Sequence, residues 1–173
     1  MVPPPVDDMA SSHSASPEVA SPDDVAAVEA RLGRRPQGRF AVVVRDAADA
    51  PVVIRNEPLL DDGTPMPTRF WLVDPDLLRR IGTLEAAGGV KRAEAAVDAG
   101  ELAAAHRRAA AARDAAIPAD HTGPRPFGGV GGTRTGVKCL HAHYASYLAT
   151  GDDPVGAWVE MQLNTIETGA EHD

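Results

Sequence analysis

The sequence predicts an α+β fold, in which four or five helices pack a small, mainly antiparallel sheet of about three strands after a disordered N-terminal tail. Two patterns predict this class. Short runs rich in β-branched residues follow one another in the first half of the chain, as in an antiparallel sheet. Elsewhere, Ser or Asp followed by Pro precedes apolar residues at helical spacing, which predicts capped amphipathic helices. A chain of 173 residues is long enough for one domain with its own core.

The N-terminal segment, residues 1–21, is dominated by Pro, Ser and acidic residues and has no apolar periodicity. Such a segment cannot bury enough apolar surface to offset its ordering entropy, so we expect it to be disordered. A helix is expected to follow. Ser21 can cap it, Pro22 suits its first position, and Gly33 ends the apolar pattern.

Three strands are expected next, at residues 39–45, 51–55 and 68–73. The first two are joined by a short polar connection. The stretch "DDGTPMPT" before the third combines Asp-Gly with two prolines, which favours a turn followed by extended chain. Trp71 lies in the third run among other apolar residues, so we expect it to be buried and to face the helices.

Helices are expected through most of the second half of the chain. Asp74 and Pro75 predict the start of one helix, which should end at Gly88. An Ala-rich helical stretch follows, and Pro118 ends it. Gly100 marks the point where this stretch can break.

The C-terminal third begins with a glycine-rich loop at residues 118–136. Long loops of this kind are often functional. One helix is expected to begin near "KCLHAHY" and a last one around "PVGAWVEMQLNTI". Together the elements make a single domain over residues 22–166, between the tail at 1–21 and a C-terminal tail at 167–173 that should fray.

Composition limits the class of partner and the compartment. The net charge of −8 disfavours nucleic acid, because binding phosphates needs a basic face. The basic run from Arg31 to Arg39 is interpreted as a solvated helix end. No window approaches the roughly 18 consecutive apolar residues of a membrane span. A single cysteine cannot form an internal disulfide, and the start lacks a signal-peptide pattern, so the cytoplasm is the expected location.

The segment "GVKCLHAHYASYLATGDDPVG" carries the single cysteine, Cys139, followed by His141 and His143. Residues two apart lie on different helix faces, so Cys139 meets His141 only if the helix begins near Cys139. In the simplest interpretation, both histidines border the core and hydrogen-bond locally. A metal site is a second hypothesis. Cys–His catalysis is a third, with His106 as a candidate partner, because a helix N-terminus and Lys138 favour a thiolate.

The stretch "GGVGGTRTGVK" suggests an anion site. Glycine amides before a helix can cradle a phosphate, and Arg134 and Lys138 would add positive charge. The spacing is not that of a Walker loop, since no Gly-Lys-Ser/Thr occurs. A flexible hinge is the alternative interpretation of these glycines.

Several motifs occur in the order found in a known bacterial family. They are "DGTPMPTRFWLVDP", "RIGTLEAAGGV", "AAAHRRA" and "GVKCLHAHYASYLATGDDPVG". On these motifs the chain resembles the DUF501 family over roughly residues 25–160. That family has no assigned reaction, so the resemblance does not identify a substrate. It does imply a bacterial, cytoplasmic protein. Its gene neighbourhood implies a link to cell division or envelope processes.

Two positions depart from the family pattern. Many members carry "RCPxGxP" where this chain has "RDAADAP", and "TCP" or "THP" where it has "VDP". Soft ligands at those places and in "KCLH" would suit zinc. The resemblance therefore implies that Asp46, Asp74, Cys139 and His141 face one point and can hold zinc, with His143 as a further candidate. Carboxylates would hold zinc less tightly than a thiolate-rich set.

The sequence does not identify a substrate. A binding or accessory protein with an unknown protein or small-molecule partner is the first hypothesis. The alternative is an enzyme that depends on a metal or on a Cys–His pair, with its site around "KCLHAH". Convergence of the candidate side chains in one pocket would favour the alternative.

Overall fold

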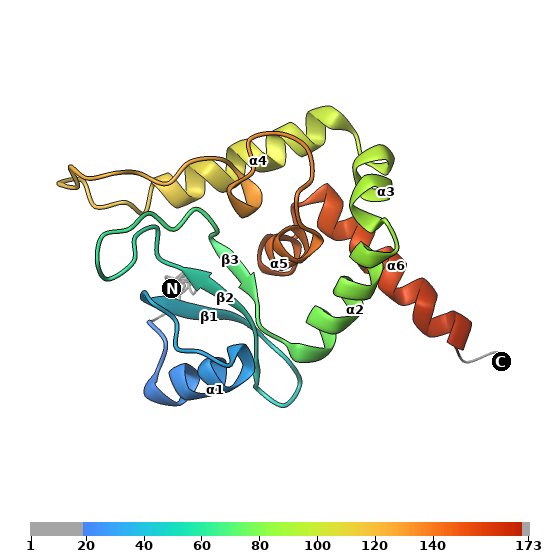
Figure 1. Cartoon of the computed structure of the whole chain (residues 1–173), viewed down its shortest axis with the longest axis horizontal. Helices are drawn as coiled ribbons and strands as arrows, with labels where there is room; N and C mark the ends of the chain where they lie inside the picture. The colour runs from blue at the N-terminus through green and yellow to red at the C-terminus, as the bar shows by residue number, and fades with distance from the viewer. Residues whose placement is uncertain (1–18, 171–173) are drawn as a thin grey trace, which may run out of the picture.

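The computed structural model describes residues 19–170, so residues 1–18 of the expected tail and the last three residues lie outside the described range. Within that range the chain has the predicted α+β fold, with six α-helices (Figure 1). In chain order the elements are α1 (Pro22–Leu32), β1 (Phe40–Arg45), β2 (Pro51–Asn56), β3 (Phe70–Leu72), α2 (Pro75–Ala86), α3 (Gly89–Ala96), α4 (Ala99–Asp114), the short 3-10 helix η1 (Val130–Gly132), α5 (Leu140–Thr150) and α6 (Pro154–Ala170).

The three strands form an antiparallel sheet in the order β1-β2-β3, as predicted. Alternate residues point to opposite faces of such a sheet. Accordingly, Val53 and Leu72, which are paired across β2 and β3, join the core beneath α5 and α6. The next pair, Ile54 and Trp71, joins the smaller core beneath α1. The sheet therefore separates α1 from α5 (Figure 1).

Local capping explains where the helices begin. Ser21 and Asp24 form a reciprocal capping box at α1, and Asp74 accepts a hydrogen bond from the Leu77 amide at α2. The Ala-rich stretch is two helices, and the break falls before Gly100. Asp98 has an extended backbone and accepts a hydrogen bond from the Glu101 amide at 2.9 Å, so it starts a new helix.

Trp71 is half-buried, so the expectation of full burial is wrong. Its ring packs on the α1 side against Phe40, Ile54 and Val73. The guanidinium of Arg34 lies 5.3 Å from the ring centroid and covers part of it. The β-branched pattern of the strand predicted the burial of its neighbours but not this shielding by a flexible cation.

Helices α5 and α6 form the centre of the larger core. Leu140, Ala145, Val155 and Val159 have no exposed surface. Gly156 lets the two helices approach closely, because a Cβ there would overlap the Cβ of Tyr147. Helix α6 continues to Ala170. No helix in the described part of the chain is long and apolar enough to cross a membrane.

Candidate metal centre

The candidate site is built at the first residues of α5. Cys139 is the N-cap residue, with an extended backbone (φ −150°, ψ 120°), and its thiol makes no capping hydrogen bond. The next residue, Leu140, is completely buried and anchors the helix start in the core. The thiol is therefore free to turn toward His141, which is the arrangement that a helix beginning at Cys139 allows.

Glu85, in the last turn of α2, supplies the cap that Cys139 does not. Its Oε1 accepts a hydrogen bond from the Leu140 amide at 2.6 Å, which satisfies one of the unpaired donors of the helix start. The same oxygen lies 3.3 Å from Nδ1 of His141. One carboxylate therefore ties α2 to α5 and faces the imidazole.

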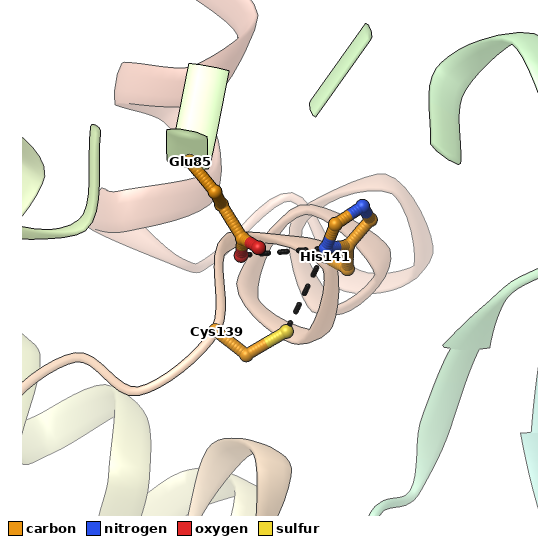
Figure 2. A group of neighbouring side chains, drawn as sticks. All are labelled: Glu85, Cys139 and His141. Carbon is orange, nitrogen blue, oxygen red and sulfur yellow. Dashed lines mark hydrogen bonds and ion pairs between the residues drawn. The ribbon is translucent and has the colours of Figure 1, made fainter. Parts of the chain in front are cut away.

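His141 connects the cluster. Its Nδ1 lies 3.8 Å from the Sγ of Cys139, and its Nε2 lies 3.0 Å from the carbonyl oxygen of Leu78. Figure 2 shows the Glu85 carboxylate and the Cys139 thiol approaching the ring from two directions. The hydrogen bond to Cys139, the Leu78 carbonyl and the Glu85 charge raise the pKa of His141 to about 9, although burial opposes them.

The three side chains offer one ligand atom each, and these atoms all lie within 4.8 Å of one another. All three residues are partly buried. A cavity of about 260 Å³ opens beside Cys139 and His141, between β3 and the start of α5. Phe70 and Leu72 contribute apolar walls, whereas Lys138, Cys139 and His141 contribute polar groups.

A comparison with protein-family models identifies the family of the chain. Residues 42–161, more than half of it, match the family described as "Protein of unknown function (DUF501)". The chain belongs to the DUF501 family. No curated protein and no solved structure matches it.

In this DUF501 protein, two of the five predicted metal ligands come together and three do not. Cys139 and His141 converge, but with Glu85 as their companion. Asp46 lies in the β1–β2 turn, where its Oδ1 accepts hydrogen bonds from two amides of that turn, both at 2.9 Å. Asp74 caps α2 and pairs with Arg31 at 3.1 Å. Both carboxylates are thus held by local backbone geometry, and neither joins the cluster.

Glu85 was missed by the sequence reasoning. Its motif, "RIGTLEAAGG", stands out only as part of the family pattern, and in the chain it precedes "KCLH" by more than 50 residues. A glutamate in the last turn of a helix is normally expected to be exposed to solvent. A signal was present in the N-cap: Cys139 is a weak capping residue, so the amides of α5 needed an acceptor from elsewhere.

His143 and His106 lie away from the cluster. The Nδ1 of His143 donates to the buried carboxylate of Asp153, with separations of 2.9 and 3.0 Å, and its Nε2 is buried without a partner among the described residues. His106 stacks edge-on against His143, with centroids 5.5 Å apart. Its Nδ1 accepts from the Val130 amide and its Nε2 donates to the Gly136 carbonyl. Both nitrogens of His106 are therefore occupied, and burial lowers its pKa.

The glycine-rich loop makes its own hydrogen bonds. The amides of Gly129, Val130, Gly132 and Thr133 all donate within the protein, so they do not point toward a ligand. Gly129 packs against the backbone of His106, where a Cβ would clash. Arg134 stacks over Phe127 at 5.2 Å, whereas Lys138 lines the cavity beside Cys139. The two cations predicted for an anion site therefore do not converge on one point.

Proposed function

We propose that the chain binds one divalent transition-metal ion, zinc by preference, through Glu85, Cys139 and His141, and that the ion acts on a substrate in the adjoining cavity. The observation that carries the proposal is the convergence of one sulfur, one nitrogen and one oxygen from two helices within 4.8 Å. Thiolate and imidazole are the ligands that favour zinc among the divalent ions.

The separations support tetrahedral coordination. Bonds of about 2.0–2.3 Å at tetrahedral angles place ligand atoms about 3.3–3.6 Å apart. The Nδ1–Oε1 distance is 3.3 Å and the Sγ–Nδ1 distance is 3.8 Å. The third separation, between Sγ and the Glu85 carboxylate, lies within 4.8 Å, and the Cys139 thiol makes no capping bond that would hold it in place.

The surroundings of His141 also fit a metal ligand. Metal-bound histidines generally donate the other ring N–H to a carbonyl or carboxylate, which fixes the tautomer. Here Nε2 lies 3.0 Å from the Leu78 carbonyl, so Nδ1 is left for the metal. In the metal-free state Nδ1 carries a proton toward Glu85, and metal binding releases it.

We propose that the ion serves catalysis and does not have a structural role. Structural zinc sites are closed by four protein ligands, whereas catalytic ones have three and keep a position for water or substrate. Three ligands and an adjoining cavity of about 260 Å³ fit the second kind. Such an ion supplies Lewis-acid and hydrolytic chemistry. Lys138 lines the same cavity and offers positive charge to a substrate.

Metal-free Cys–His catalysis is less well supported by the geometry. A nucleophile and an orienting carboxylate normally contact different nitrogens of the base. In this site Cys139 and Glu85 approach the same nitrogen of His141, and the other nitrogen is bound to a backbone carbonyl. His106, the other candidate base, has both nitrogens occupied.

A cytoplasmic binding or accessory role is the second candidate function. The observation that favours it is Phe127, a 60% exposed aromatic residue with the Arg134 guanidinium stacked over it. Aromatic residues and arginines are enriched at the centres of protein interfaces. A link to cell division or envelope processes is a prediction from the gene neighbourhood of the family, and no contact among residues 19–170 bears on it.

Metal content tests the first proposal. The full chain, purified without a metal-affinity step, is expected to contain about one zinc per chain by elemental analysis. Glu85→Gln, Cys139→Ser and His141→Asn should each reduce it to near zero. Glu94→Gln is the matched control, because Glu94 also accepts a backbone amide before α5, that of Val137, but does not face His141. Equal zinc in all four variants would contradict the assignment.

A further inference from the structure

A second cavity, of about 200 Å³, lies beyond Phe70 from the metal ligands. Phe70 lines both cavities. The polar groups around the second cavity differ from those of the first. They include two arginines, Arg69 and Arg108, one carboxylate, Asp152, which pairs with Arg108, and two hydroxyl-bearing residues of α5, Ser146 and Thr150.

Arg69 is the unusual member of this lining. Among the described residues its guanidinium has no ion pair or hydrogen bond, and it lies 5.9 Å from the centroid of the Phe70 ring. It is only partly exposed. Burial lowers the pKa of Arg69, and the charges of Arg55 and Arg113 add to that effect more than Glu57 opposes it. A guanidinium remains charged in proteins, so this positive charge has the electrostatic attraction of Glu57 but no direct ion pair among the described residues.

Other arginines at comparable positions are paired. Arg31 pairs with Asp74, and Arg113 pairs with Asp114. Arg108, on the wall of the same cavity, pairs with Asp152 at 2.6 Å. The chain holds 25 acidic residues against 17 basic ones, so carboxylates are in excess. An unpaired, partly buried arginine in such a chain indicates a place where an anion from outside completes the pair.

The two cavities lie along one face of α5. Cys139, Ala142, Ser146 and Thr150 follow one another at spacings of three or four, so they share that face. At about 1.5 Å per residue, Ser146 and Thr150 lie about 10–16 Å along the helix from Cys139. A narrow space of about 10 Å³, lined by Arg69, Phe70 and residues of both cavities, lies between them. That volume admits about one water-sized group.

We propose that the cavity beside Arg69 binds the anionic end, a carboxylate or a phosphate, of an elongated substrate whose other end reaches Glu85, Cys139 and His141. The part of this inference that concerns the reacting end rests on the proposed function, whereas anion binding at Arg69 does not. The narrow space between the cavities requires a thin linker between the two ends, of single-methylene width. The substrate class is therefore an extended small anion.

The test is a titration of the full chain with inorganic phosphate and, separately, with acetate, each in the presence and in the absence of zinc. Binding is monitored by the NMR signals of the backbone amides and of the arginine side chains. We expect shifts at the Nε–H of Arg69 and at the amides of Ser146 and Thr150. Arg69→Gln should weaken anion binding about tenfold or more, the loss expected for one charge-assisted hydrogen bond. Arg107→Gln is the control, since Arg107 is exposed on α4 and its loss changes the net charge equally.

The outcomes separate the two proposals. Shifts that arise elsewhere, or that persist equally in Arg69→Gln and Arg107→Gln, overturn the anion site even if zinc is bound. Anion shifts at Arg69 in a chain that binds no zinc uphold the anion site and overturn the metal proposal. If Arg69→Gln does not fold, the anion site is still tested by the location of the shifts in the wild-type chain and by the anion affinity of Arg69→Lys. The tighter of the two probes identifies the anion as phosphate or carboxylate.

Discussion

Substitution of Asp153 tests how much a buried carboxylate contributes to the stability of the packing between α5 and α6. Its carboxylate is completely buried and accepts the Nδ1–H of His143 at 2.9 Å. It also accepts the amides of Val155 and Gly156, each at 3.0 Å, at the start of α6. The adjacent Asp152 is a matched control, because its carboxylate is 59% exposed and pairs with Arg108.

The magnitude follows from these contacts. Loss of a helix cap costs about 0.5–2 kcal/mol, and leaving the buried Nδ1 of His143 unsatisfied costs about 1–3 kcal/mol more. Asp153→Ala should therefore lower the free energy of unfolding by about 1.5–5 kcal/mol. Asp152→Ala removes an exposed ion pair and should cost no more than about 1 kcal/mol. Asp153→Asn should fall between them, since the amide oxygen still caps but cannot satisfy the His143 donor equally.

The assay is urea denaturation of the three variants and the wild type, followed by circular dichroism and analysed as a two-state transition. Equal losses for Asp152→Ala and Asp153→Ala would refute the reasoning, because they would show that the buried carboxylate contributes no more than an exposed one.

Three further predictions concern other parts of the fold. Gly156→Ala should destabilise by about 1–3 kcal/mol or more through overlap with Tyr147, whereas Gly82→Ala, with open space at its Cβ, should stabilise α2 by up to about 1 kcal/mol in thermal melts. Trp71→Ala should cost less than the roughly 3 kcal/mol at which the range for fully buried aromatic residues begins, because Trp71 is only partly buried, and a larger loss in denaturant titrations would contradict this. His106 has a lowered pKa in the fold, so the unfolded chain takes up its proton first as pH falls through about 6.5. Wild-type stability should therefore fall between pH 7.5 and 5.5 by more than that of His106→Gln, and identical losses would exclude this cause.

Much of the fold is predictable from the sequence because its signals are local. Ser21 with Pro22, and Asp74 with Pro75, place two helix starts by capping alone. Strand alternation places Val53 and Ile54 on opposite faces. The predicted break near Gly100 is confirmed, and the new helix starts at Asp98 because its side chain accepts the Glu101 amide as a cap.

The site is predictable only in part, for a physical reason. Cys139 and His141 are adjacent in the chain, and a helix start between them is enough to bring them together. Glu85 reaches them from another helix, and its position depends on how α2 packs against α5. The family resemblance places Asp46 and Asp74 at positions of Cys or His, but an aspartate accepts hydrogen bonds from turn and cap amides, which a thiol satisfies poorly.

Replacement of zinc by cobalt(II) tests the central claim most directly, because the absorption spectrum of cobalt reports both its geometry and its ligands. The full chain loaded with one equivalent of Co²⁺ is expected to show the intense visible bands of a four-coordinate ion and a thiolate-to-metal charge-transfer band. The charge-transfer band should disappear in Cys139→Ser, and Glu94→Gln should retain both features. A weak six-coordinate spectrum, or a spectrum that Cys139→Ser leaves unchanged, would contradict a metal centre at Glu85, Cys139 and His141.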